Sequence, residues 1–330
     1  MMDPLVSLVI PGRNCADTIR ACLEAVVPLL KGPFLREIIF VDDGSKDDSR
    51  EIVSHYPVTL LAGPGHGPGA ARNLGWRHAR HPFVWFVDSD CVAEPVALDK
   101  LMPELSDPKV GAVSGSYGNM RSESLLACLI HEEIIERHRR MPSRVDFLAT
   151  FNVVYRRDVL ERVNGFDERF LKGQDAELSW RVAAAGYELG FVFESRVKHY
   201  HEDQWLPYLR TQRHQGYWRV FLHLSHSGHS AGDSYSRLTD HVQPPLAMLS
   251  LVTLPLWGFY PWGVVNAACV GLLALAQIPL TFRLVRRMRQ ARYLAFSLLS
   301  FARAFWRGVG MTHATMNWLL KGKAFFCAAT

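Results

Sequence analysis

The N-terminal half of the chain alternates short apolar runs with segments of helical periodicity. Apolar runs rich in β-branched and aromatic residues predict strands at residues 6–10, 37–41, 58–61 and 83–87. The more polar segments between these runs predict helices near residues 17–30, 47–54 and 69–79. Strands that are apolar on both faces and separated by helices are typical of parallel β-α-β units. The pattern therefore predicts an α/β fold with a mostly parallel sheet flanked by helices.

The pattern becomes mixed from residue 111 onward. It predicts strands near residues 112–114 and 148–155, and helices near residues 124–139 and 175–185. Short apolar runs at residues 189–193 then close the unit near His199. Residues 1–205 are therefore predicted to form one domain, followed by acceptor-side or linker helices over residues 206–242.

Two uncharged stretches, residues 244–259 and 262–282, make the C-terminal region (residues 243–330) strongly apolar. As helices they would span about 24 Å and roughly 30 Å, and the hydrocarbon core of a bilayer is about 30 Å thick. Aromatic residues of the kind that favour membrane interfaces gather at the turn between them: Trp257, Tyr260 and Trp262. We expect a helical hairpin, or one span plus a re-entrant segment. The alternative is a buried helical subdomain.

A third apolar stretch, residues 293–311, includes Arg303 and Arg307 and predicts an interfacial helix. Five arginines follow the second uncharged stretch: Arg283, Arg286, Arg287, Arg289 and Arg292. Basic residues beside an apolar helix favour the cytoplasmic leaflet. We therefore expect the protein at the cytoplasmic face of the membrane, anchored through its C-terminal helices.

Composition excludes several classes of protein. With 48% hydrophobic residues among 330, the chain can fill a sizeable core and is not intrinsically disordered. A net charge of +5 does not by itself argue for nucleic acid binding. The six cysteines lack the spacing of a disulfide framework or a zinc site, and the N-terminus lacks signal-peptide features. A reducing, cytoplasmic environment is expected for the bulk of the chain.

Polar clusters follow three of the predicted strands, at residues 11–14, 42–45 and 88–90. Ligands bind at the carboxyl ends of strands in parallel sheets, so the three clusters are expected to share one edge. Asp88-Ser89-Asp90 presents two carboxylates that suit a divalent cation, Mn²⁺ or Mg²⁺, and through it a diphosphate. A helix N-cap or solvated loop is the alternative. Asp42 is expected to bind a base imino group or a ribose hydroxyl, unless it only forms an Asp-Gly turn.

A glycine-rich segment, residues 63–69, leads to a helix start with Arg72 in its first turn. This arrangement suits a phosphate or a metal-bound carboxylate, and the alternative is an ordinary loop followed by a surface arginine. Residues 65–70 also fit the loose dinucleotide pattern G-x-G-x-x-A, which keeps an NAD-dependent dehydrogenase as a minor hypothesis. Against it, the match falls in the third β-α connection, and Pro68 lacks an N–H that a pyrophosphate would use.

Asp175 and Glu177 lie at the start of an amphipathic helix, where the helix dipole keeps a carboxylate ionised, as a general base requires. Glu177 caps its own helix in the alternative interpretation. His199 and His201 alternate along an extended segment and point the same way. His199 is expected to ligate a metal together with Asp90, although a lone histidine is more often a structural hydrogen-bonding residue.

Six motifs occur in order between residues 5 and 201: Val-Ile-Pro-Gly-Arg-Asn, Val-Asp-Asp-Gly-Ser, Gly-Ala-Ala-Arg-Asn, Val-Asp-Ser-Asp, Gly-Gln-Asp-Ala-Glu-Leu-Ser-Trp-Arg and His-Tyr-His. Their order and spacing resemble the inverting family 2 glycosyltransferases of the GT-A fold. The resemblance implies a metal-dependent hexosyltransferase that takes a sugar from a nucleoside-diphosphate sugar, with UDP-linked donors expected first. The acceptor would be a hydroxyl of a lipid-linked, cell-envelope or small molecule.

The resemblance also implies roles for individual residues. The general base would be Asp175, and a Mn²⁺ or Mg²⁺ ion would be held by Asp90 and His199 with Asp88. Donor-binding residues would be Pro11, Arg13, Asn14, Asp42, Gly69, Arg72, Asp88 and Ser89. Acceptor-side residues would be Gln174, Trp180, His201 and Trp218.

Two positions depart from the family pattern. Gln174 stands where Glu usually precedes the base, which removes a charge that would position the acceptor or raise the pKa of the base. Residues 215–219 read Gln-Gly-Tyr-Trp-Arg, with the last pair reversed relative to the Gln-x-x-Arg-Trp signature of processive synthases. We therefore expect transfer of a single sugar, and the alternative function is a catalytically silent nucleotide-sugar-binding module.

Overall fold

The computed structural model describes residues 4–226 and 234–322. Within them, residues 4–120 and 137–201 form one compact unit (unit 1), and residues 121–136 and 202–322 form a second (unit 2). Cys327 and residues 227–233 of the predicted linker lie outside the described residues. The described cysteines are all free, as predicted.

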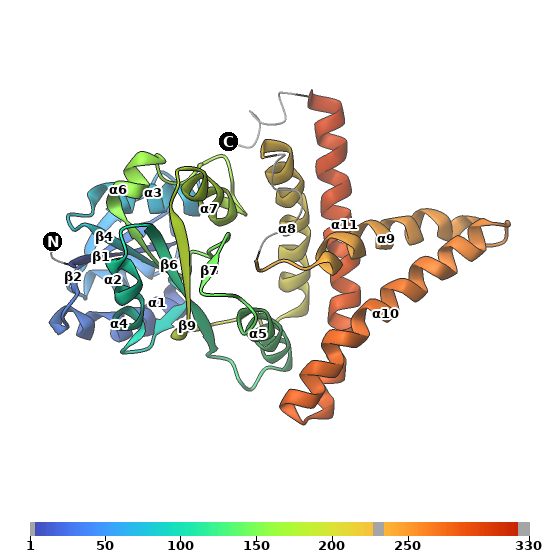
Figure 1. Ribbon diagram of the computed structural model, residues 1–330, viewed down its shortest axis with the longest axis horizontal. Helices are drawn as coiled ribbons and strands as arrows, with labels where there is room; N and C mark the ends of the chain where they lie inside the picture. Colours follow the sequence, from blue (N-terminus) through green and yellow to red (C-terminus); the bar gives the residue numbers. More distant parts are fainter. Residues whose placement is uncertain (1–3, 227–233, 323–330) are drawn as a thin grey trace. The chain divides into compact units, whose positions relative to one another are not determined.

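Unit 1 is built on one nine-stranded sheet within the described residues (Figure 1). Its strands are β1 (Val6–Gly12), β2 (Leu35–Asp42), β3 (Thr59–Ala62), β4 (Phe83–Val87), β5 (Cys91–Ala93), β6 (Val110–Asn119), β7 (Arg144–Val145), β8 (Asn152–Arg156) and β9 (Glu188–His199). They are ordered β3-β2-β1-β4-β8-β6-β9-β5, and β7 pairs with β9. The parallel run β3-β2-β1-β4 confirms the predicted β-α-β units. The rest of the sheet is mixed, because β8 runs antiparallel to both of its neighbours.

Helices cover both faces of this sheet. They are α1 (Ala16–Val26), α2 (Ser49–Ser54), α3 (Pro68–His78), α4 (Ala97–Leu101), α6 (Arg157–Arg162) and α7 (Gln174–Ala184), with 3₁₀ turns η1 (Val27–Lys31) and η2 (Met102–Ser106). One core lies between the sheet and α1 with α4, and includes Leu8 and Trp85. The other lies between the sheet and α3, α6 and α7, and includes Val9 and Phe86. Successive strand residues enter opposite cores, which is why the strands read as continuous apolar runs.

Unit 2 is helical in its described residues. It contains α8 (Trp205–Ser225), α9 (Leu238–Thr253), α10 (Trp262–Met288) and α11 (Ala295–Lys321), the 3₁₀ turns η4 (Leu254–Leu256) and η5 (Ala291–Leu294), and most of α5 (Leu125–His138). Glycines let α8 and α11 approach closely. A Cβ on Gly216 would lie 2.2 Å from the carbonyl oxygen of Arg307, and one on Gly310 would lie 1.9 Å from that of Arg213. Any side chain at either position would force the two helices apart.

Charged side chains of unit 2 pair with one another. The pairs are Arg283–Glu136, Arg287–Glu136, Arg303–Glu133 and Arg307–Asp240. Arg303 is only 7% exposed, and its Nη2 lies 3.0 Å from Glu133 Oε1. Arg283 and Arg287, in the last turns of α10, are therefore paired with carboxylates of α5, so the basic cluster is not fully available to lipid headgroups.

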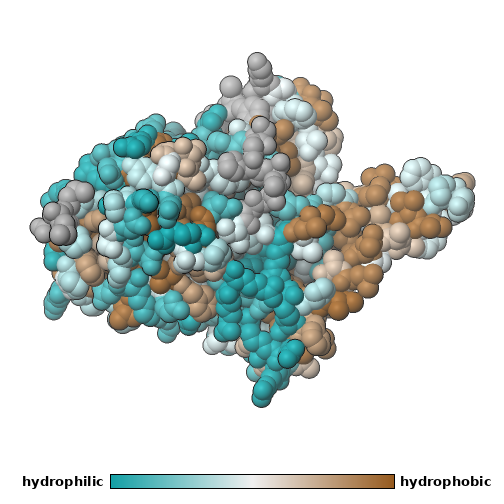
Figure 2. All heavy atoms as spheres, viewed as in Figure 1, coloured by the Kyte–Doolittle hydropathy of each residue, from teal (hydrophilic) through white to brown (hydrophobic). Residues whose placement is uncertain are grey.

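α9 and α10 form the predicted hairpin. Its polar side chains lie between the two helices and its apolar side chains lie on the outside, the reverse of a water-soluble helix pair. Polar groups lie between the helices: Asn266 Nδ2 donates to the carbonyl oxygen of Ser250 at 2.6 Å, and Gln277 Nε2 donates to Gln243 Oε1 at 3.0 Å. Leucines and aromatic residues cover the outside. Figure 2 shows much of the hairpin in brown and its tip in pale blue. α10 is also long and apolar enough to cross a membrane. Polar contacts inside and apolar side chains outside are typical of helices in lipid.

Candidate active site

Three strand ends bring the predicted polar clusters to one edge of the sheet. β1 ends at Gly12, directly opposite Asp42 at the end of β2. β4 runs parallel to β1 and ends at Val87, immediately before Asp88. Because the three strands are parallel neighbours, the residues that follow them leave the sheet at its carboxyl edge.

Strand pairing brings Asp90 to His199, although 109 residues separate them. Cys91 of β5 pairs with His199 at the end of β9, and the Tyr200 N–H donates to the carbonyl oxygen of Asp90 at 3.0 Å. As a result, His199 Nε2 lies 3.2 Å from Asp90 Oδ2. Two ligands at right angles and about 2.1 Å from one cation lie about 3 Å apart, so this pair fits a shared divalent ion.

Cys91 is the third potential ligand of this group. Asp90, Cys91 and His199 offer donor atoms within 4.8 Å of one another. Desolvation raises the pKa of the buried Cys91 thiol well above its ordinary value, and a protonated thiol is a poor ligand. Desolvation also raises the pKa of Asp90, but the neighbouring His199 outweighs it and leaves that pKa below its ordinary value. One ionised carboxylate and one imidazole remain, a set that suits Mn²⁺ or Mg²⁺ when phosphate and water oxygens complete the shell.

Asp88 has a different partner. Arg72 Nη2 donates to Asp88 Oδ1 at 2.6 Å, and Asp88 is not part of the group around Asp90. Arg72 is 4% exposed, stands 5.7 Å from the centre of the Phe166 ring, and has no hydrogen-bond partner for Nε or Nη1 among the described residues. Buried N–H groups without partners are costly, and phosphate oxygens would satisfy them. The metal role predicted for Asp88 stays a prediction.

Hydrogen bonds tie together the loops that follow β1 and β2. Asn14 Oδ1 accepts from the Lys46 N–H at 2.8 Å, and the Asn14 N–H donates to Ser45 Oγ at 2.9 Å. Asp42 is 1% exposed, accepts from the Ser45 N–H at 3.1 Å, and lies 3.5 Å from Arg50 Nη1. Asp42 thus stabilises the Asp-Gly turn, which was the alternative to nucleoside binding. The other predicted donor-binding positions are Pro11 (buried in β1), Arg13 (exposed), Gly69 (first turn of α3) and Ser89 (partly buried).

Asp43 holds the glycine-rich loop in place. Its carboxylate accepts from the N–H groups of Gly65 and Gly67, each at 2.8 Å. Both glycines have positive φ, 77° and 99°, a conformation that favours glycine. Because these N–H groups are bound to Asp43, they are not directed at a pyrophosphate. The match to the dinucleotide pattern therefore lacks the glycine N–H groups by which it would bind a pyrophosphate, and it no longer supports a dehydrogenase.

Asp175 is the second residue of α7, after Gly173 with its φ of 81° and Gln174. Burial raises the pKa of Asp175 above its ordinary value, although the Ala176 N–H at 3.0 Å and the charge of Arg72 lower it. Desolvation therefore outweighs the stabilisation expected from the helix terminus. Arg72 and Asp88 both lie close enough to affect this pKa, so the three side chains belong to one electrostatic site.

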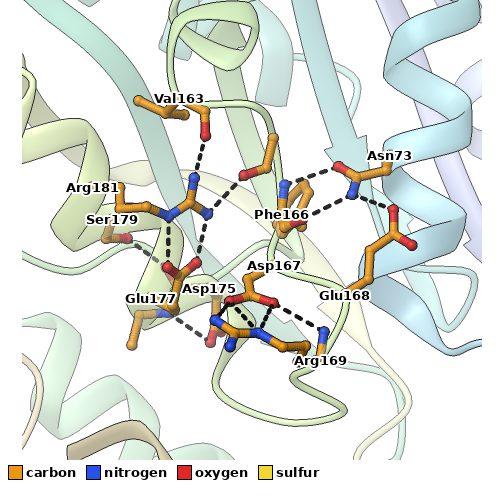
Figure 3. Close-up of polar contacts among 12 residues, drawn as sticks. Asn73, Val163, Phe166, Asp167, Glu168, Arg169, Asp175, Glu177, Ser179 and Arg181 are labelled. Atoms are coloured by element: carbon orange, nitrogen blue, oxygen red, sulfur yellow. Dashed lines mark hydrogen bonds and ion pairs between the residues drawn. The ribbon is translucent and has the colours of Figure 1, made fainter. Parts of the chain in front are cut away.

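Two side chains that belong to the quoted motifs but had no predicted role hold the chain that leads to Asp175 (Figure 3). The first is Asn73. It is 2% exposed. Its Nδ2 donates to the Phe166 carbonyl oxygen at 2.9 Å and to Glu168 Oε1 at 2.7 Å. Its Oδ1 accepts from the Phe166 N–H at 2.8 Å and from Trp76 Nε1 at 2.9 Å. One amide thus joins α3 to the loop before α7.

The second is Arg181, which acts from α7 itself (Figure 3). Its guanidinium donates to the carbonyl oxygens of Val163 and Gly165, the latter at 2.7 Å, and pairs with Glu177. Glu177 is 1% exposed, and both of its carboxylate oxygens accept from Arg181. The i,i+4 spacing of the two residues was the available sequence signal.

Replacing Asn73 by Ala is expected to destabilise unit 1 by about 2 kcal/mol or more. The change leaves three buried groups without this partner: the backbone N–H and carbonyl oxygen of Phe166 and the indole N–H of Trp76. Urea unfolding of the full chain measures this. Glu168→Gln is the matched control, since it keeps the acceptor oxygen and lies on the surface. Equal unfolding midpoints for the two variants would contradict the assigned role of Asn73.

The residues predicted for the acceptor side are all buried. The exposed fractions are 7% for Gln174, 4% for Trp180, 2% for His201 and 6% for Trp218. Gln174 Oε1 has no hydrogen-bond partner in the described part of the chain. Trp218 belongs to α8 of unit 2, where it packs on Phe221. Acceptor binding by these four residues stays a prediction.

Comparison with known proteins identifies relatives of this chain. Residues 7–163 match the family described as Glycosyl transferase family 2. The Pre-mycofactocin glycosyltransferase of Mycobacterium tuberculosis is 32% identical over 210 residues, which cover 60% of this chain and 43% of that protein. Glycosyltransferase AglE of Haloferax volcanii is 29% identical over 206 residues, which cover 58% and 65%. The aligned part thus spans less than two thirds of either relative.

One solved structure resembles nearly the whole chain. It is the mannosyltransferase PcManGT from Pyrobaculum calidifontis in complex with GDP-Man and Mn²⁺, which matches with a TM-score of 0.60 at 17% identity. The match covers 94% of this chain and 89% of that chain. At this identity the likeness establishes the GT-A fold and nothing about the substrates of this chain.

Proposed function

We propose that this chain, which belongs to glycosyltransferase family 2, transfers one sugar from a nucleoside-diphosphate sugar to a hydroxyl group with inversion at the anomeric carbon. The observation that carries the proposal is the pair of His199 Nε2 and Asp90 Oδ2 at 3.2 Å, in the same unit as Asp175 with its raised pKa. A cation-binding pair and a separate base are the two components that such a reaction needs.

Donor binding is assigned to the carboxyl edge of the sheet. Asp42 and the loop of Pro11 to Asn14 would contact the nucleoside, and Asp88 would face the ribose or the sugar. Nε and Nη1 of Arg72, the two nitrogens without partners among the described residues, would donate to the phosphates, whose charge the guanidinium complements. The donor of the similarly folded mannosyltransferase is a GDP-sugar, so GDP-linked donors deserve testing beside the UDP-linked ones that the sequence favoured.

In the proposed reaction, Asp175 removes the proton from the acceptor hydroxyl as the oxygen attacks the anomeric carbon. Its raised pKa makes it a stronger base than a solvated aspartate. Arg72 lies close enough to Asp175 to favour its ionised form. A divalent cation held by Asp90 and His199 would supply positive charge that stabilises the departing diphosphate.

Gln174 bears on the choice of acceptor. A glutamine here keeps hydrogen-bonding capacity without a charge, so it places no second carboxylate beside Asp175. Its buried Oε1 has no partner among the described residues, and a hydroxyl of the acceptor would satisfy it. This supports a neutral, hydroxyl-rich acceptor.

The proposal is tested by incubating the protein with Mn²⁺ and a panel of UDP-, GDP- and dTDP-linked sugars, and measuring release of the nucleoside diphosphate. Slow donor hydrolysis that requires the cation is the expected result. Donor binding without any hydrolysis or transfer would instead support a catalytically silent nucleotide-sugar-binding module.

We also propose that the α9–α10 hairpin anchors the protein in a membrane, at the cytoplasmic face, and that the acceptor is lipid-linked. The outward-facing leucines of α10 support this, since Leu272 and Leu275 are 53% and 60% exposed. A soluble protein rarely leaves such a continuous apolar surface uncovered.

The double substitution Leu272→Lys with Leu275→Lys is expected to shift the full chain from the membrane fraction to the soluble fraction. Each lysine at mid-membrane depth costs roughly 2.5–3.5 kcal/mol. Flotation of the protein with liposomes measures the shift, and the matched control changes the same two leucines to Met. If the lysine and methionine variants float equally, the hairpin does not contact lipid.

A further inference from the structure

His199 has a second close contact besides Asp90. Its Nδ1 lies 2.8 Å from Nδ1 of His201, and the two rings meet edge to face with centroids 4.5 Å apart. His201 is 2% exposed, and the ring of Tyr117 contacts both imidazoles. The side chain of His201 is therefore fixed against the ring nitrogen of His199 that faces away from Asp90.

The contact constrains where the protons sit. Two imidazole nitrogens at 2.8 Å form a hydrogen bond only if one carries a proton and the other a lone pair. A cation bound at His199 Nε2 requires a lone pair there, which places the proton of neutral His199 on Nδ1. His201 Nδ1 must then be the acceptor, with its own proton on Nε2.

Without a cation, the same pair adopts the opposite arrangement. His199 Nε2–H then donates to Asp90 Oδ2, and His201 Nδ1–H donates to His199 Nδ1. Each imidazole shifts its single proton from one ring nitrogen to the other between the two arrangements. In both arrangements one proton lies between the two Nδ1 atoms, so their hydrogen bond is kept.

From this geometry we infer that His201 is the positioning residue of His199: it hydrogen-bonds His199 Nδ1 with the site loaded or empty, and so keeps Nε2 directed at Asp90. The inference rests on the proposed function, because it assumes that Asp90 and His199 hold the cation. A carboxylate or a carbonyl oxygen in the place of His201 would only accept, and would support the loaded arrangement alone.

The inference is tested by the Mn²⁺ affinity of the full chain in the presence of UDP or GDP, measured from the electron paramagnetic resonance signal of free Mn²⁺. His201→Phe keeps a ring but loses the nitrogen, and is expected to weaken Mn²⁺ binding about 10–100-fold, as loss of an outer-shell partner does. His201→Asn can both donate and accept, and is expected to restore most of the affinity.

Tyr117→Leu is the matched control, because it removes ring packing from both imidazoles and keeps the contact between their nitrogens. It is expected to bind Mn²⁺ nearly as well as the wild type. Wild-type affinity in His201→Phe would overturn the inference, as would equal losses in His201→Phe, His201→Asn and Tyr117→Leu. If His199→Ala has no effect on Mn²⁺ binding, the proposed metal site itself fails, which is a different result.

Discussion

Asp175→Asn is expected to lower kcat by about 10²–10⁴-fold, the usual contribution of a general base, while nucleotide binding stays nearly intact. The amide has the shape of the carboxylate but does not accept the acceptor proton. The pH profile provides a second readout. Because burial raises the pKa of Asp175, wild-type activity should rise with pH through that raised pKa as the carboxyl ionises, and this rising limb should disappear in Asp175→Asn.

Asp167→Asn is the matched control for this change. Asp167 lies in the loop that precedes Asp175, but its partly buried carboxylate is engaged with Arg169 at 2.6 Å. The control variant is expected to retain activity. Steady-state kinetics measures the loss of kcat, and nucleotide titration by calorimetry measures donor binding separately. Loss of donor binding along with activity in Asp175→Asn would mean that Asp175 binds the donor and is not the base.

Asp90→Asn is expected to weaken Mn²⁺ binding by more than about 100-fold, since a side chain that contacts the cation contributes more than one that only hydrogen-bonds a ligand. Cation-dependent donor hydrolysis should be lost with it. The physical reason is that an amide oxygen carries no net charge, so one neutral imidazole and one amide hold a divalent cation weakly.

Asp88→Asn separates the two carboxylates of the motif. Asp88 is paired with Arg72 and lies outside the group around Asp90, so this variant should keep Mn²⁺ affinity but raise the KM for the donor. Measuring Mn²⁺ affinity and donor KM for Asp90→Asn and Asp88→Asn decides whether Asp88 binds the donor or the cation. Equal loss of Mn²⁺ affinity would instead make Asp88 a ligand, as the family resemblance implied.

Most of the fold was predictable because its signals are local. The strand predicted at residues 83–87 is β4, and the predicted helices at 69–79 and 175–185 are α3 and α7 within one residue. β5, a strand of three residues, and α4, a helix of five residues, went unpredicted, because neither is long enough to show strand alternation or a helical period. The partly antiparallel half of the sheet was also missed, since the direction of β8 is decided by its neighbours in space.

Residue types and their order along the chain thus determined the α/β core, the shared edge of the polar clusters and the apolar hairpin. Only the tertiary structure decided how the charges are partnered. Asp88 was grouped with Asp90 because only Ser89 separates them in sequence, yet Arg72 from α3 pairs with Asp88 and His199 from β9 contacts Asp90. The register of β5 on β9 produces the second pairing, and burial sets the pKa of Asp175. Both effects depend on segments about a hundred residues apart, which no local pattern encodes.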